Sequence, residues 1–203
     1  LATVSLSSSN IQLNCVPDRL AICIRRQVAS LNCCDTDSYL TINGISINWN
    51  NQAGLLSSMT PEMLYRSSIL SGLSNLTWDE FCGQTMHSGN PDNNSSDPLG
   101  PYTGEGATNG TNRTSGIRLV PTTGSILVLN FAEVIQLTEE YYAPGSLGSF
   151  NLQLTVNATN NHAYEWEAGK IEMIIMPMLS GVFVCEKGTS STFISLLTKD
   201  DVL

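Results

Sequence analysis

Apolar and polar residues alternate along several short segments of the chain, which is the pattern of strands with one buried face. The clearest segment is FNLQLTVNAT (150–159), in which leucine and valine alternate with asparagine, glutamine and threonine. RLAICIRRQV (19–28) alternates in the same way. GSILVLNFAEVIQL (124–137) is predicted as one strand, and it is continuously apolar at 126–129, as in a strand covered on both sides. Further strands are predicted within IEMIIMPML (171–179), GVFVCE (181–186) and STFISLL (191–197).

The alternation changes phase within YLTINGISINW (39–49). Leu40 and Ile42 share one phase, and the apolar residues from Ile45 onward take the opposite phase. The change falls at Asn43-Gly44. It indicates either a two-residue hairpin with positive φ at both positions, or one strand in which a glycine bulge shifts the register.

One helix is predicted after Thr60. The threonine can cap it, Pro61 suits the first helical position, and Glu62 lies at the positive end of the helix dipole. The helix is expected to end near residues 72–75, and WDEF (78–81) to form one further turn. The apolar stripe expected along the helix consists of Tyr65, Ile69 and Leu73.

Residues 83–124 are rich in Gly, Asn, Ser, Thr and Pro and contain few apolar residues. This composition predicts a long polar loop between two strands, and loops of that length are usually functional or disordered. Several antiparallel strands, one short helix and this insertion predict an all-β fold, an antiparallel β-sandwich of jelly-roll type. The length of 203 residues is compatible with one domain over 1–203.

The segment EEYYAPGSLGSFNLQLTVNAT (139–159) joins two of these strands through a turn of small residues. Pro144 fixes φ, and Gly145 supplies the conformational freedom that a tight turn needs. Gly148 is expected to allow a close approach of the backbone where the next strand enters the sheet. Tyr141 and Tyr142 are expected to pack against a neighbouring loop or subunit with their hydroxyls in water.

Charge and the length of the apolar runs argue against two classes of function. The net charge is −9, and the nine Lys and Arg residues form no basic patch that could neutralise phosphates, so direct nucleic acid binding is not expected. No run of about 18 apolar residues exists, so no membrane span is expected. The chain begins with Leu1 and has no signal-peptide pattern, which suggests a processed product or a segment of a longer chain.

Residues for catalysis or metal binding show no convincing pattern. Neither His87 nor His162 has the local signature of a catalytic triad. The acids in CCDTDSY (33–39) alternate, but the segment lacks the glycine and distal glutamate of a calcium loop. The two glutamates at 139–140 are adjacent and point apart on an extended chain, unlike a glycosidase pair. We therefore predict no catalytic, cofactor-binding or metal-binding residue, no cofactor, and no enzymatic activity.

Cysteines and glycosylation motifs do not decide whether the protein is secreted or stays inside the cell. There is no CxxC pair, and a buried free thiol is the simplest interpretation of Cys23. The six cysteines lie at positions 15, 23, 33, 34, 82 and 185. The N-x-S/T motif is short and this chain is rich in Asn, Ser and Thr, so chance alone can supply most of its occurrences. These motifs begin at Asn75, Asn93, Asn94, Asn109, Asn112 and Asn157.

The order of several segments resembles a known family. IQLNCVPDRLAICIRR is followed by LTINGISINWNNQAGLLSS, by the predicted helix and polar loop, by the APG turn with its flanking strands, and by LTKDDVL at the end. This order is similar to the second jelly roll of the double jelly-roll major capsid proteins of polinton-like viruses, virophages and nucleocytoplasmic large DNA viruses. The resemblance covers most of residues 10–203 and leaves 83–124 unmatched.

The resemblance implies a structural subunit of a viral capsid. In that family two jelly rolls lie side by side in each chain, and three chains form a pseudo-hexameric homotrimer of an icosahedral shell. It implies that residues 1–203 are one jelly roll or the later part of one, the C-terminal jelly roll of a longer chain. Neighbouring capsomers, penton and minor capsid proteins would be its partners, in a virion assembled inside the host cell.

Two alternatives stay open at this stage. One is a minor or penton capsid protein with a single jelly roll. The other is a secreted or surface carbohydrate-binding β-sandwich glycoprotein, in which Trp49, Trp78 and Trp166 are the candidates for stacking on a sugar. In a capsid protein, Trp49 would belong to the core and Trp78 would pack under the helix.

Overall fold

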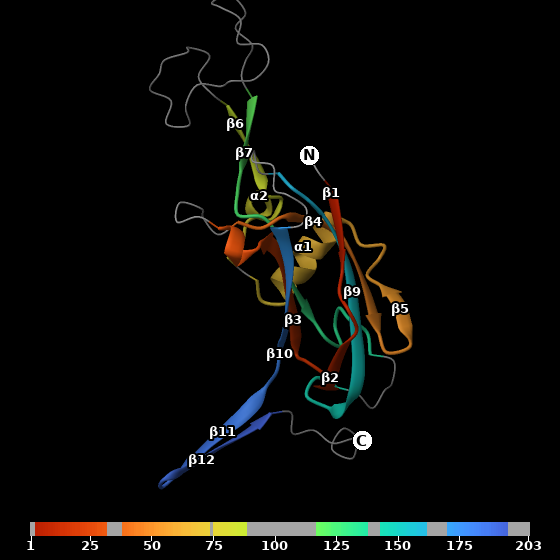
Figure 1. Cartoon of the computed structure of the whole chain (residues 1–203), viewed down its shortest axis with the longest axis vertical. Helices are drawn as coiled ribbons and strands as arrows, with labels where there is room; N and C mark the ends of the chain where they lie inside the picture. The colour runs from red at the N-terminus through yellow and green to blue at the C-terminus, as the bar shows by residue number, and fades with distance from the viewer. Residues whose placement is uncertain are drawn as a thin grey trace, which may run out of the picture.

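The structure is a computed structural model of the chain, and it describes residues 3–31, 38–73, 75–88, 117–137, 143–161 and 170–194. Two antiparallel sheets form the body of the molecule, and two strand pairs extend from its opposite ends (Figure 1). The predicted all-β fold is therefore confirmed for the described residues.

The larger sheet has five strands in the order β1-β9-β4-β5, with β2 also paired to β9. The strand β9 is the longest of the five. One of its edges pairs with β4, and the other edge pairs with β1 and β2 in succession. The five strands are β1 (Thr3–Ser7), β2 (Ile11–Cys15), β4 (Thr41–Trp49), β5 (Gln52–Leu55) and β9 (Leu147–Thr159).

The smaller sheet has the order β10-β3-β8, and the remaining strands form the separate pairs β6-β7 and β11-β12. Three short helical segments complete the described part of the fold. The bounds are β3 (Arg19–Arg26), β8 (Ile126–Asn130), β10 (Ile171–Met178), β6 (Gln84–Ser88), β7 (Ile117–Pro121), β11 (Gly181–Glu186), β12 (Thr189–Ile194), η1 (Val28–Ser30), α1 (Pro61–Leu70) and α2 (Trp78–Phe81).

The inner faces of both sheets share one hydrophobic core. Trp49 lies within it, stacked on Phe150 with ring centroids 5.2 Å apart and in edge contact with Phe131 at 4.9 Å. The alternation predicted for 150–159 is confirmed, because Leu152, Leu154 and every second residue around them are fully buried. Burial of these side chains is the main stabilising contribution to the sandwich.

The helix α1 covers the free edge of β8. Its capping is as predicted, since the Met63 backbone N–H donates to Thr60 Oγ1. The predicted stripe is displaced, however: Leu64 and Ser68 are the buried residues of the helix, and Tyr65 and Ile69 lie on its flank. Serines replace apolar residues here because they accept hydrogen bonds from the sheet.

Those hydrogen bonds join the helix to the strand edge. The backbone N–H of Val128 donates to Ser68 Oγ at 3.1 Å, and that of Asn130 donates to Ser71 Oγ at 3.1 Å. The opposite edge of β8 pairs with β3. Both edges of the strand are thus hydrogen-bonded. Its three central residues are buried, as the continuous apolar run at 126–129 predicted for a strand covered on both faces.

The WDEF segment forms the predicted extra turn, α2. The Thr77 N–H donates to Glu80 Oε2 at 2.7 Å, and the Glu80 N–H donates to Thr77 Oγ1, which is a capping box. The hydrogen bond from the Thr77 backbone lowers the pKa of Glu80. Thr122 of the chain after β7 donates to the carbonyl of Asp79, which ties this turn to the sheet.

Several predicted boundaries differ from the structure. The region 39–49 is one strand whose register with β9 shifts between Ile42 and Gly44, so the bulge interpretation is correct. The strand expected to continue beyond 126–129 ends at Asn130, because Ala132 takes a positive φ of 71° in a turn. The last strand begins at Thr189 rather than at Ser191, since it pairs with β11 around the turn at Gly188, and the predicted residues 195–197 lie outside the described residues.

The polar stretch 83–124 is not a loop throughout. Its first residues form β6 and its later residues form β7, and the two pair antiparallel. The prediction missed them because polar residues dominate the stretch and mask the short apolar run in 117–121. Residues 89–116 lie outside the described residues.

The APG turn connects the two sheets rather than two neighbouring strands. Gly145 has φ 91°, and its N–H donates to the Val16 carbonyl at 2.8 Å. The Val16 N–H in turn donates to the Ser146 carbonyl at 3.0 Å. At Gly148 the close neighbour is a side chain and not the expected backbone, because a Cβ there would lie 2.8 Å from the ring of Phe150. Tyr141 and Tyr142 lie outside the described residues.

Replacing Gly145 with valine is expected to lower the free energy of unfolding by about 1–3 kcal/mol, because a β-branched residue is strained at positive φ. Chemical denaturation of the purified protein measures the change. Gly44→Ala is the matched control, since Gly44 has no positive φ and a Cβ there would meet nothing within 4 Å. Equal stability of the two variants would show that the turn does not require glycine.

Replacing Ser68 with alanine is expected to destabilise the protein by about 1–3 kcal/mol, because the buried Val128 N–H loses its acceptor. Ser67→Ala is the control on the same helix, where the side chain is partly exposed. Urea denaturation curves for both variants test this. Little difference between them would contradict the role of Ser68 at the strand edge.

Candidate interaction surfaces

The residues considered for catalysis are not brought together in the described part of the chain. His87 lies in β6, with Arg118 of β7 as its partner in the ladder. His162, the acids of 33–37 and the glutamates at 139–140 lie outside the described residues. Within the described ranges, no three His, Cys, Asp or Glu residues gather into a group that could hold a metal. The absence of site residues stays a prediction.

The tryptophans that the structure describes are packing residues. Trp49 is fully buried in the core, as expected for a capsid protein. Trp78 packs in edge contact with Tyr65 of α1 and lies parallel to Phe81, with ring centroids 5.3 and 6.2 Å away. Trp166 lies outside the described residues. Trp49 is therefore unable to stack on a sugar, and Trp78 has its place under the helix.

Four cysteines have described positions, and all four are free thiols. Cys15 and Cys23 are buried, Cys82 is partly buried, and Cys185 is exposed. Burial raises the pKa of Cys23; the charge of Arg25 lowers it by less, and the charge of Glu172 raises it slightly. Burial also raises the pKa of Cys82. A raised pKa leaves less of the reactive thiolate at neutral pH.

The native protein is expected to protect Cys15 and Cys23 from a thiol-alkylating reagent at pH 8, and the unfolded protein to expose both. Peptide mass spectrometry before and after unfolding measures the modification of each residue. A mass that shows these two thiols paired in disulfides would contradict the assignment and favour a secreted protein.

The outer face of the larger sheet is polar and uncharged. Its five strands contain no charged residue and no histidine. The side chains hydrogen-bond across the strands: Asn10 donates to Asn151 Oδ1 at 3.2 Å, and Asn48 donates to Gln153 Oε1 at 3.4 Å. A chain with net charge −9 thus keeps one whole sheet face free of charge. Such a face can be covered without desolvating an ion.

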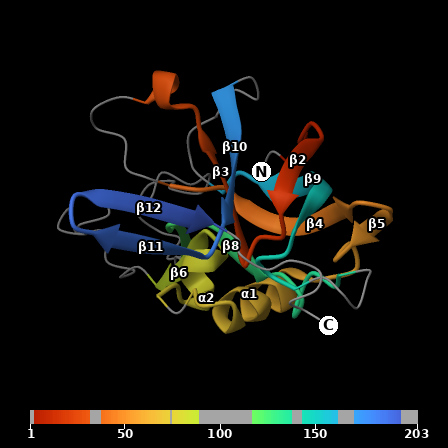
Figure 2. The same ribbon diagram turned by 90° about the horizontal axis from the view of Figure 1, so that it is seen from below.

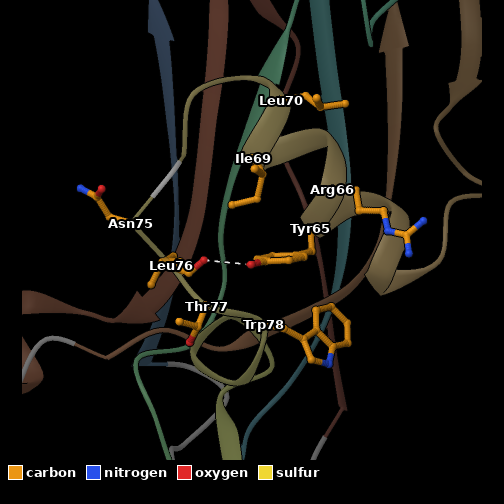
Figure 3. A pocket seen from close by; sticks show the side chains of 8 residues that line it. All are labelled: Tyr65, Arg66, Ile69, Leu70, Asn75, Leu76, Thr77 and Trp78. Atoms are coloured by element: carbon orange, nitrogen blue, oxygen red, sulfur yellow. Dashed lines mark hydrogen bonds between the residues drawn. The ribbon is translucent and has the colours of Figure 1, made fainter.

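A hollow of about 640 Å³ lies between α1 and the segment that follows it (Figure 3). Tyr65 forms part of its wall and donates a hydrogen bond from its hydroxyl to the Leu76 carbonyl at 3.0 Å. Leu70 on the last turn of the helix is 81% exposed. We call this hollow the α1 groove, and it is lined by Tyr65, Arg66, Ile69, Leu70, Asn75, Leu76, Thr77 and Trp78.

A second apolar surface lies on the β11-β12 hairpin, which projects from one end of the sandwich (Figure 1). Every residue of both strands is exposed. The sequence predicted both strands of the hairpin, but neither its exposed apolar surface nor the α1 groove. A signal was present in GVFVCE, where apolar residues do not alternate with polar ones, so the apolar side chains point to both faces of the strand.

Among the described residues, no helix has the length and apolar character that a membrane crossing requires. The polar sheet face, the apolar groove and the projecting apolar hairpin are features of a protein that packs against other protein surfaces. Comparison with known proteins gives the family.

The sequence model of the family described as "Major capsid protein V20 C-terminal domain" matches residues 1–181. The chain belongs to this family. The resemblance to double jelly-roll capsid proteins is thereby confirmed, and structural capsid proteins, not enzymes, are its relatives. The carbohydrate-binding alternative has no support from this match.

A curated relative and two solved structures agree with this family. The putative capsid protein V20 of Sputnik virophage is 26% identical over 208 residues, which cover 100% of this chain and 31% of the relative. A chain of the 3.5 Å cryo-EM structure of Sputnik virophage matches with a TM-score of 0.73 and 24% identity, over 100% of this chain and 36% of that one. The crystal structure of the mavirus major capsid protein matches with a TM-score of 0.72 and 18% identity, over 99% of this chain and 37% of that one.

The two structural matches show that the fold is that of these capsid proteins, and the predicted jelly-roll class is confirmed. This member of the V20 C-terminal domain family spans about a third of the length of the relatives that it matches. Its relatives are virion proteins, as expected for the location of this chain.

Proposed function

We propose that this chain is the C-terminal jelly roll of a longer double jelly-roll major capsid protein. The match of residues 1–181 to a C-terminal capsid domain carries the proposal. The chain accounts for 31% of the curated relative, which leaves room in such a polypeptide for a second jelly roll of similar size. Three copies of the whole protein then form a pseudo-hexameric trimer, and these trimers build an icosahedral shell.

The surfaces of the chain support this role. The uncharged face of the larger sheet suits close packing against another sheet or domain, because hydrogen bonds and water can bridge it without a cost for buried charge. The β6-β7 pair leads away from the sandwich at the end opposite to the β11-β12 hairpin (Figure 1). The insertion that it carries, within 83–124, would lie at the exposed surface of the trimer.

The partners follow from the same proposal. Neighbouring trimers, penton and minor capsid proteins contact this subunit within a virion assembled inside the host cell. The chain contributes no catalytic group to this role. Its contribution is a rigid sandwich whose surfaces match those of the subunits around it.

Purified full-length protein containing this chain is expected to form trimers, which mass photometry detects directly. Electron microscopy of assembled particles is expected to show pseudo-hexameric units. The control is the same protein with Trp49→Ala, which removes the centre of the core and should abolish trimers together with folding. A stable monomer would contradict the trimer, and a five-fold ring would instead identify a penton protein.

A further inference from the structure

The two sheets of the sandwich differ in their number of strand positions. Because β1 and β2 follow one another along the same edge of β9, the larger sheet has four positions, and the smaller sheet has three. A jelly roll typically packs two sheets of about four strands each. Within the described residues, the smaller sheet is therefore one strand short, and the missing position lies at one of its edge strands, β8 or β10.

The edge of β10 is the open one. At the other end of the sheet α1 covers β8, where Ser68 and Ser71 accept hydrogen bonds from the strand. The strand β10 pairs with β3 on one side, and no described strand pairs with it on the other. A strand edge with unpaired backbone groups is a template for a further strand.

Alternate backbone groups of β10 point to this open edge. Ile24 of β3 lies opposite Met173, and its carbonyl accepts a hydrogen bond from the Leu40 N–H at 2.8 Å rather than from β10. Opposite residues of an antiparallel pair exchange either both of their hydrogen bonds or neither. The N–H and C=O groups of Met173 therefore face away from β3, and those of Ile175, two residues further on, do the same.

The hydrophobic core is open on the same side. Met173 and Ile175 pack against the core but are only half-buried, whereas Leu152 and Leu154 of β9 are fully buried. The facing strands β1 and β2 show the same feature, because all of their apolar residues that pack against the core are half-buried. These residues are Val4, Leu6, Ile11 and Leu13.

One additional strand would satisfy both requirements. In Figure 2, β2 and β10 lie on one side of the body, and α1 lies on the opposite side. A strand placed beside β10 thus lies across from β1 and β2. Its backbone can pair with the open edge, and its inward side chains can cover the half-buried residues of both sheets.

The position of β1 indicates where such a strand comes from. It occupies the outer position of the larger sheet on this side, so polypeptide that leads into it arrives beside the open edge of β10. The matched family is a C-terminal domain, and the chain accounts for 31% of the curated relative, so the longer protein of the proposed function has ample chain upstream. A strand tethered in this way has a high effective concentration at the edge.

We propose that a strand from the polypeptide preceding Leu1 pairs antiparallel with the open edge of β10 and completes the smaller sheet. This inference rests on the proposed function, which supplies the longer polypeptide, and it places the start of this jelly roll before Leu1. The strand alternates apolar and polar residues, with the apolar ones facing the core. Its pairing ends near Pro177, which has no N–H to donate.

Hydrogen exchange of the full-length protein tests whether the edge is occupied. The N–H groups of Ile174 and Met176 face β3 in either case, so they are the internal control. Those of Met173 and Ile175 are expected to exchange at least about a hundredfold more slowly than in an unstructured peptide. Fragmentation mass spectrometry resolves the single amides. Fast exchange at 173 and 175 beside slow exchange at 174 and 176 would overturn the proposal.

Photo-crosslinking in the full-length protein identifies the occupant. Ile174 is partly exposed on the outer face of β10, within about 5 Å of a neighbouring strand's side chains, and is replaced by p-benzoyl-phenylalanine. After irradiation, peptide mass spectrometry is expected to find links within one copy, to a single segment upstream of Leu1. The same analogue at Leu70, exposed on α1, is the control and should not link to that segment.

Other links contradict the proposed occupant. Links to a second copy would show that the edge is an interface between subunits, and links to residues after Ile194 would show that the end of the chain covers it. Either result overturns the proposal.

Mass photometry of the same samples separates this proposal from the proposed function. Trimers with fast exchange at Met173 and Ile175 would refute the additional strand and leave the capsid trimer standing. A protein that forms no trimers, yet shows slow exchange and the upstream link, would keep the strand and refute the trimer.

Discussion

The edge of β8 sets a constraint on which much of this structure depends. Both faces of the strand pack in the core, yet one of its edges has no neighbouring strand among the described residues and satisfies its backbone N–H groups by other means. The hydroxyls of Ser68 and Ser71 do this, because α1 lies along the edge at the right height. A helix thus covers the edge of this sheet, and its position is determined by hydrogen bonds to the strand.

The placement of α1 also explains the surface beside it. Because the helix turns Leu64 and its serines toward the strand, several of its other apolar side chains are left on the flank and form the α1 groove with the segment around Trp78. The capping box at Thr77 and the hydrogen bond from Tyr65 to Leu76 hold that segment against the helix.

The sequence was most informative where one physical rule acted alone. Strict alternation in 150–159 predicted β9 correctly, and Thr60 and Pro61 predicted the start of α1, because both signals are local. The buried face of α1 was predicted wrongly because a serine is not expected in a core. Ser68 is buried because its hydroxyl accepts a hydrogen bond from the edge of β8, which the sequence does not show. The end of β8 was missed because nothing local announces the positive φ of Ala132. The groove and the hairpin surface depend on tertiary placement, and a short apolar run does not show whether it will be buried.

The uncharged outer face of the larger sheet has a consequence for the conditions under which its contacts can form. Hydrogen bonds between amides and hydroxyls involve no group that titrates near physiological pH, and mobile ions do not screen them as they screen ion pairs. The strength of contacts made through this face therefore depends little on pH or on salt concentration. A particle whose subunits met through this face would keep those contacts on passing into a dilute or saline medium.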